Sequence, residues 1–209
     1  MEAYCRKIER EIDHPRHGGS MAEKKYYAVK KSKKTEETAP VPRERLEEGW
    51  MLAYVDGSYD DSIKKYAFGC VFLLPDGRIF TEYGNGDDLK SLQHRNVTGE
   101  MLGAMYAVQF ARMNGFQGVE LRYDYEGIEK WVTGAWRAKT ERTMEYARAM
   151  REWGRSIELR FVKVQAHSNV YYNELADKMA KTGLEKGAGV PRLRLIEDME
   201  EYHGTDETE

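Results

Sequence analysis

Apolar residues gather in short runs between residues 50 and 187 of this 209-residue chain, and their spacing predicts alternating strands and helices. Strands are expected where an apolar run ends at turn-forming residues, and helices where apolar residues recur every three to four positions. The predicted strands are Trp50–Ser58, Ala67–Leu74, Ile79–Tyr83, Val119–Tyr123 and Ile157–Val164. The predicted helices are Thr98–Asn114, Glu126–Thr133, Arg142–Gly154 and Tyr171–Lys186.

The order of these elements, β-β-β-α-β-α-α-β-α, predicts one α/β domain over residues 50–187. Its sheet should be mixed and five-stranded, with helices on both faces, because short connections and long crossovers both occur. Residues 1–20 end in Gly-Gly-Ser followed by Met21, and we interpret them as a tag or leader. Residues 21–49 are interpreted as a basic segment and Pro-containing linker, and residues 188–209 as an acidic tail. We expect both ends to be flexible.

The composition places the protein in a cellular compartment and limits its partners. No apolar run approaches the roughly 20 residues of a membrane span and no signal peptide is visible, so we predict a soluble, cytoplasmic protein. The two cysteines, Cys5 and Cys70, make no metal or disulfide framework. The net charge of −3 gives no overall attraction to nucleic acid, so such binding would depend on local basic patches.

Four carboxylates lie beside apolar sequence at separate places along the chain: Asp56, Glu100, Asp124 and Asp177. An uncompensated buried charge costs several kcal/mol, so four such acids need a common counter-charge, which a pair of divalent metal ions supplies. Each acid alone has an ordinary alternative. Asp56 could form a turn, and Glu100 could be a first-turn helix acid behind a Thr98 cap. Asp124 could cap a helix, and Asp177 could belong to a solvated helix face. The prediction therefore rests on all four together.

Two further features favour a site at these acids. A stripe of small residues follows Glu100 along its helix, made of Gly103, Ala104, Ala107 and Ala111. Such a stripe lets the helix lie close to a sheet and brings Glu100 within reach of a strand end. His167 lies in the loop between the last strand and the acidic helix, where it could deliver a proton. Its alternative is an ordinary surface histidine.

Four groups of residues follow one another in a recognisable order: Asp56-Gly57-Ser58, Asn96–Glu100, Tyr123–Ile128, and Val162–His167 with Asn173–Asp177. Together they resemble a type 1 ribonuclease H of the bacterial kind that lacks the basic protrusion helix. The likeness covers about residues 50–187. Only the short segment 134–142 lies where longer relatives place that helix.

The resemblance implies a metal-dependent endonuclease that hydrolyses the RNA strand of RNA–DNA hybrids and leaves 5′-phosphate products. The four carboxylates would hold two Mg²⁺ ions, which Mn²⁺ could replace, around the scissile phosphate. Glu174 matches the family's auxiliary acid and His167 its mobile histidine. Asn96 matches a minor-groove contact. The other residues implied to bind substrate are Thr98, Trp136, Lys139, Thr140 and Asn173. We expect a monomer.

The chain departs from the family pattern at two places. Glu126 stands where many relatives carry Gln, which leaves one minor-groove contact open, and Gln165-Ala166-His167 replaces a commoner Lys-Gly-His. Residues 25–31 also resemble the opening strand of the hybrid-binding domain that precedes many such enzymes. Since only about a dozen residues match, they would be a remnant, with a solvated basic tail as the alternative.

Two other functions compete with this interpretation. A proofreading-type exonuclease of similar fold carries Asp-x-Glu on its first strand, whereas this chain has Asp56-Gly57-Ser58. A non-catalytic hybrid-binding module of a replication assembly would be expected to lack one of the acids, whereas the chain has all four.

Overall fold

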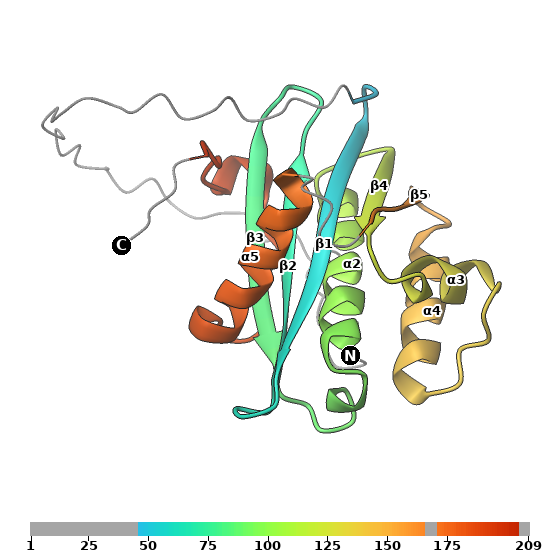
Figure 1. The fold of residues 1–209 in the computed structure, drawn as a ribbon. Helices are drawn as coiled ribbons and strands as arrows, with labels where there is room; N and C mark the ends of the chain where they lie inside the picture. The colour runs from blue at the N-terminus through green and yellow to red at the C-terminus, as the bar shows by residue number, and fades with distance from the viewer. Residues whose placement is uncertain (1–45, 166–170, 205–209) are drawn as a thin grey trace, which may run out of the picture.

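The computed structural model describes residues 46–165 and 171–204. Five strands form one mixed sheet in the order β3-β2-β1-β4-β5, with helices on both faces (Figure 1), which confirms the predicted fold class. The strands are β1 (Trp50–Asp60), β2 (Lys65–Leu73), β3 (Ile79–Gly86), β4 (Gly118–Tyr123) and β5 (Glu158–Lys163). The helices are α2 (Asn96–Met113), α3 (Gly127–Thr133), α4 (Glu141–Trp153) and α5 (Tyr171–Lys186), with short 3₁₀ helices η1 (Leu92–His94) and η2 (Ile196–Asp198). The predictions for residues 1–45 and for His167 lie outside the described residues.

The central strand β1 extends further than the sequence predicts. It pairs antiparallel with β2 as far as Asp60 opposite Lys65, whereas its parallel pairing with β4 ends at Tyr54 opposite Arg122. The predicted strand Trp50–Ser58 therefore ends two residues too early, and the turn considered for Asp56 does not form. Its second half continues the hairpin with β2 and lies beyond the end of β4. Asp56 therefore lies in the middle of β1, where the strand pairs with β2 and not with β4.

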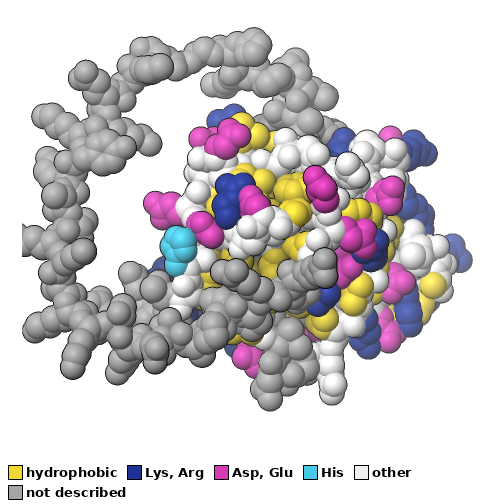
Figure 2. Space-filling model, turned by 90° about the horizontal axis from the view of Figure 1, so that it is seen from above, with side chains coloured by type: hydrophobic (Ala, Val, Ile, Leu, Met, Phe, Trp, Pro, Cys, Tyr) yellow, Lys and Arg dark blue, Asp and Glu magenta, His cyan; other side chains and the backbone are white. Residues whose placement is uncertain are grey.

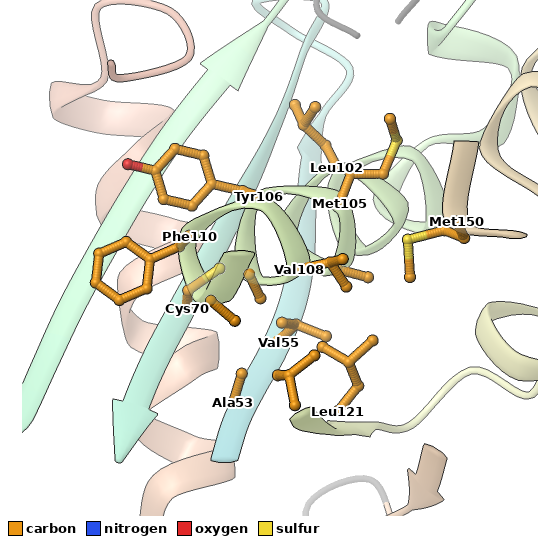
Figure 3. Packing of buried hydrophobic residues seen from close by; sticks show 14 of the residues in the cluster. Ala53, Val55, Cys70, Leu102, Met105, Tyr106, Val108, Phe110, Leu121 and Met150 are labelled. Carbon is orange, nitrogen blue, oxygen red and sulfur yellow. The ribbon is translucent and has the colours of Figure 1, made fainter. Parts of the chain in front are cut away.

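Alternate residues of β1 enter two separate cores, as expected for a strand covered on both faces. Met51, Ala53 and Val55 pack toward α2, whereas Leu52 and Tyr54 pack toward α5. Figure 3 shows the α2 core, whose labelled residues include Val108 and Phe110 of α2, Cys70 of β2, Leu121 of β4 and Met150 of α4. Every residue of α2 from Thr98 to Ala111 is buried, because the helix is enclosed by the sheet and by other elements.

The last described residues form a strap along β3 and α2. We call residues 188–204 the C-terminal strap. The Asn85 side chain accepts from Gly189 N at 2.9 Å, and the Tyr106 hydroxyl donates to Arg192 O at 3.3 Å. Leu193 is only 4% exposed and belongs to the α2 core. The expectation of a flexible tail is therefore wrong for these residues, although the acids of the strap remain exposed.

The described surface mixes charges of both signs. Figure 2 views the molecule from the upper end of Figure 1, where Lys and Arg side chains alternate with Asp and Glu in small groups. This agrees with the expectation that any attraction for nucleic acid is local. Among the described helices, none has the length and apolar character needed to cross a membrane.

The strap gives a test of stability with an internal control. Leu193→Ala removes a buried side chain and should cost about 2–4 kcal/mol, which lowers Tm by roughly 5–10 °C in a chain of this size. Leu195→Ala removes the same atoms from a residue that is 41% exposed and should change Tm little. Calorimetry of both variants checks this. Equal Tm values would mean that the strap is not docked.

Candidate active site

Two glycines set the position of Glu100 relative to the sheet. A Cβ atom on Gly57 of β1 would overlap Asn96 O and Glu100 N of α2, and a Cβ on Gly99 would overlap Ala67 O of β2. Backbone therefore lies directly on backbone at the start of α2. The predicted small-residue stripe does pack closely, since a Cβ on Gly103 would lie 3.3 Å from Phe68 Cβ. The tightest approach, however, is one turn earlier than the stripe.

The buried Glu100 side chain ties α2 to the end of β4. It is 3% exposed, and its Oε1 accepts from Asp124 N at 3.1 Å and Tyr125 N at 3.2 Å. Glu100 is not a first-turn acid, because α2 begins at Asn96. Thr98 is not a cap either, since it lies inside α2 and its hydroxyl donates to Ser91 O.

Asp124 does not cap α3. That helix begins at Gly127, and its N-cap residue is Glu126, which makes no side-chain cap hydrogen bond. Asp124 instead lies directly after β4, half-buried, with its backbone bound to Glu100. The alternative role of Asp124 as a helix cap is therefore wrong.

A third glycine, in β2, allows α5 to approach the sheet beside Asp56 from the face opposite α2. Gly69 of β2 is the register partner of Asp56. A Cβ on Gly69 would overlap Ala176 O and Ala180 N of α5. Asp177 lies between these two positions along the helix, and its Oδ2 binds Lys181 Nζ at 2.6 Å. The fold thus places Asp177 beside Asp56.

The acids interact electrostatically with one another. Burial raises the pKa of Asp56 to about 7, and the neighbouring charges of Asp124 and Asp177 contribute to this rise, whereas Gly57 N–H and Lys181 oppose it. Burial, and then the charge of Asp124, also holds the pKa of Glu100 well above its ordinary value. Such mutual effects require that the carboxylates lie close together. The structure therefore gathers acids from β1, α2, the end of β4 and α5.

The donor set fits a divalent cation. It consists of carboxylate oxygens, which Mg²⁺ and Mn²⁺ prefer, and it carries an excess of negative charge. No three acidic, histidine or cysteine side chains in the described part of the chain are already arranged as a metal-binding group. Glu100 faces two backbone amides and Asp177 faces Lys181, so both side chains would have to adjust to share a cation.

Three of the residues predicted to bind substrate line one cavity. Trp136, Lys139 and Thr140 border a cavity of about 490 Å³, together with His94 and residues of α3 and α4. His94 Nε2 lies 2.9 Å from Thr140 Oγ1. Sequence reasoning missed His94, because it precedes Thr140 by 46 positions and no motif marks it. The loop 134–140 contains no helix, in agreement with the predicted lack of a protrusion helix.

The other residues predicted to bind substrate or to move protons differ in their exposure to solvent. Asn96 is exposed in the first turn of α2, and Glu174 is exposed on α5, one turn before Asp177. Thr98 and Asn173 are buried. The Thr98 side chain therefore holds the loop before α2 and lies too deep to reach a ligand. His167 lies outside the described residues.

Between the acids and the cavity lies a group of aromatic and charged side chains. Tyr125, Trp131 and Trp136 pack with ring centroids 5.6–6.5 Å apart. Lys130 Nζ lies 4.8 Å from the Trp136 ring centroid. The Glu126 carboxylate binds Lys130, and it also accepts from Lys163 Nζ at 3.1 Å.

Comparison with known proteins bears on this site. The family model described as RNase H matches residues 48–185. None of the curated proteins matches the chain in sequence. Among solved structures, RNase H1 from Halobacterium salinarum is 26% identical with a TM-score of 0.55, over 66% of this chain and 98% of that one.

Two more distant structures share the fold. The LC11-RNase H1 in complex with an RNA/DNA hybrid is 18% identical, with a TM-score of 0.51 over 64% of this chain and 99% of that one. The N-terminal RNase H domain of a Mycobacterium tuberculosis protein is 14% identical, with a TM-score of 0.51 over 65% of this chain and 96% of that one.

The raised pKa of Asp56 predicts how stability depends on pH. The acid titrates near 3.8 when unfolded and near 7 when folded, so the folded protein loses stability as pH rises between these values. Asp56→Asn removes this loss, which is about 4 kcal/mol at most, because each pH unit between the two values is worth about 1.4 kcal/mol. In EDTA, the variant should have the higher Tm above pH 7 and the same Tm near pH 3.5.

Mg²⁺ supplies the complementary measurement. Above pH 7 it should raise the Tm of the original chain more than that of Asp56→Asn, since a ligand that binds only the folded state stabilises it. A variant that is less stable than the original chain at pH 8 in EDTA would contradict the pKa of Asp56.

Proposed function

Because the chain belongs to the RNase H family and is a ribonuclease H, we propose that it is an endonuclease cutting the RNA strand of RNA–DNA hybrids with Mg²⁺. The observation that carries the proposal is the gathering of acids from four elements, linked through Tyr125 to a cavity with aromatic and cationic walls. The structure of LC11-RNase H1 is a complex with an RNA/DNA hybrid, which supports the same substrate class here.

The proposed metal ligands are Asp56, Glu100, Asp124 and Asp177. When bound, a pair of divalent ions would polarise the scissile phosphate, activate water and stabilise the leaving 3′-oxygen, so that the product keeps a 5′-phosphate. The chain's own contribution is to hold the acids in place. Glu100 is fixed by two backbone amides, and Asp56 by the ladder between β1 and β2.

Other residues are proposed to handle protons and substrate. Glu174, exposed one turn before Asp177, and His167 are proposed to exchange protons with solvent at the leaving group. Asn96, exposed at the start of α2, is proposed to contact the minor groove, where the 2′-hydroxyl distinguishes RNA from DNA. Trp136 with its cavity neighbours is proposed to hold the DNA strand.

Some predictions go beyond what supports this proposal. The leader at 1–20, the hybrid-binding remnant in 21–49, the monomeric state and the cytoplasmic location stay predictions. Mn²⁺ as a substitute for Mg²⁺ is also a prediction, based on the preference of both ions for carboxylate oxygens.

A labelled RNA–DNA hybrid tests the function. In Mg²⁺, the chain should produce internal RNA fragments bearing 5′-phosphates, and EDTA should stop the reaction. Asp56→Asn should lower kcat by at least about 100-fold, because a lost metal ligand removes several kcal/mol of transition-state stabilisation and each 1.4 kcal/mol is tenfold. In EDTA, it should bind the hybrid no more weakly than the original chain.

A matched control and two contrary outcomes complete the experiment. Asp76→Asn makes the same chemical change in the β2–β3 turn, where Asp76 pairs with Arg78, and should leave kcat unchanged. Binding of the hybrid without cleavage in Mg²⁺ or Mn²⁺ would indicate a non-catalytic binding module. Release of mononucleotides from one end would indicate an exonuclease.

A further inference from the structure

Glu126 joins α3 to the end of β5 at the edge of the candidate site. It lies two residues after Asp124, at the N-cap of α3. One carboxylate oxygen, Oε2, binds Lys130 Nζ of α3, and the other, Oε1, accepts from Lys163 Nζ at the end of β5 at 3.1 Å. The side chain is 38% exposed, and the two lysine side chains are 34% and 48% exposed. The three thus form a surface cluster in which both oxygens of the acid are occupied.

Lys130 is held from two sides. Its ammonium group binds Glu126, and it lies 4.8 Å from the centroid of the Trp136 ring, within the range of a cation–π interaction. The backbone adds a link, since Trp136 N donates to Lys130 O at 2.9 Å. A lysine side chain has a flexible four-carbon stem, and fixing it in advance lowers the entropy lost when a ligand binds. Trp136 also lines the cavity that contains Lys139 and Thr140.

We propose, on the basis of the function proposed above, that Glu126 is a positioning residue for the substrate surface. It holds Lys130 on Trp136, and Lys163 beside them, in the arrangement that meets the nucleic acid. Direct contact between Glu126 and the minor groove is the competing role, since many relatives carry Gln there. Both of its oxygens already accept from ammonium groups, which favours the positioning role.

The direction in which Glu126→Gln changes KM distinguishes a positioning role from a simple charge effect. An acid beside a polyanion repels it, so if charge alone mattered, Glu126→Gln would lower KM for the hybrid and steepen the salt dependence of binding. If Glu126 positions Lys130, the same change releases the lysine and raises KM although the surface becomes more positive. The amide is nearly isosteric with the carboxylate, so packing is kept.

The kinetic test uses the full chain, Mg²⁺ and a short RNA–DNA hybrid. Glu126→Gln should raise KM about three- to tenfold and keep kcat within about twofold. Lys130→Met should raise KM similarly, and the double variant should be no worse than Lys130→Met alone, because both changes remove one arrangement. Glu152→Gln removes the partner of Arg155 on the surface of α4 and should change neither constant. A lower or unchanged KM in Glu126→Gln, additive effects, or a loss confined to kcat would overturn the inference.

A spectroscopic measurement makes the inference independent of activity. The ring of Trp136 should shift the ε-methylene proton resonances of Lys130 upfield, and Glu126→Gln should return them toward the values of a free lysine. Retention of the shift in Glu126→Gln would also overturn the inference. If the original chain cuts no hybrid, the proposed function fails, whereas an active chain with an unchanged KM in Glu126→Gln overturns only the positioning role.

Discussion

The repulsion among gathered carboxylates is the constraint on which the rest of this structure depends. Glu100 is almost fully buried, and the pKa values of Glu100 and Asp56 are both raised by burial and by their acidic neighbours. Separating these carboxylates, or replacing them with uncharged residues, would make the folded protein more stable. A cation would offset their charge, so the same side chains that weaken the folded protein at neutral pH are the ones we propose as metal ligands.

Close backbone contact holds the acids together in spite of this repulsion. Gly57 and Gly99 allow α2 to lie directly on β1 and β2, and Gly69 allows α5 to do so on the opposite face, one strand from Asp56. Rigid helices and a continuous sheet fix these contacts, and a side chain at any of the three glycines would push a helix outward. Helices on both faces of the sheet therefore contact β1 and β2 at the same level. This contact lies beside the middle of β1, so Asp56 lies within a strand and not at its end.

The sequence predicts the order of the elements and the four acids, because apolar periodicity and charged residues beside it are local signals. It does not predict that β1 continues to Asp60, since the Asp56-Gly57 pair favours a turn and only pairing with β2 overrides that preference. The strap has the sequence of an acidic tail because its few apolar residues, such as Leu193, are separated by charges. His94 beside Thr140 and Lys163 beside Glu126 come from distant segments, so only tertiary structure brings them together.

Under the proposed function, the charges around the site would couple the binding of metal to the binding of nucleic acid. Under the proposed function, the four acids, with Lys181 bound to Asp177, would repel a phosphate backbone until divalent cations reversed the sign of the charge at the centre of the site. The surface beside it also carries cations, since Lys130 lies against the exposed Trp136 ring, Lys139 lines the cavity beside that ring, and Lys163 binds Glu126. Under the proposed function, a nucleic-acid strand would bind to that surface without metal, whereas its scissile phosphate would approach Asp56 only with metal bound. Linkage then requires that the hybrid raise the affinity of the site for metal by the factor with which metal raises the affinity for the hybrid.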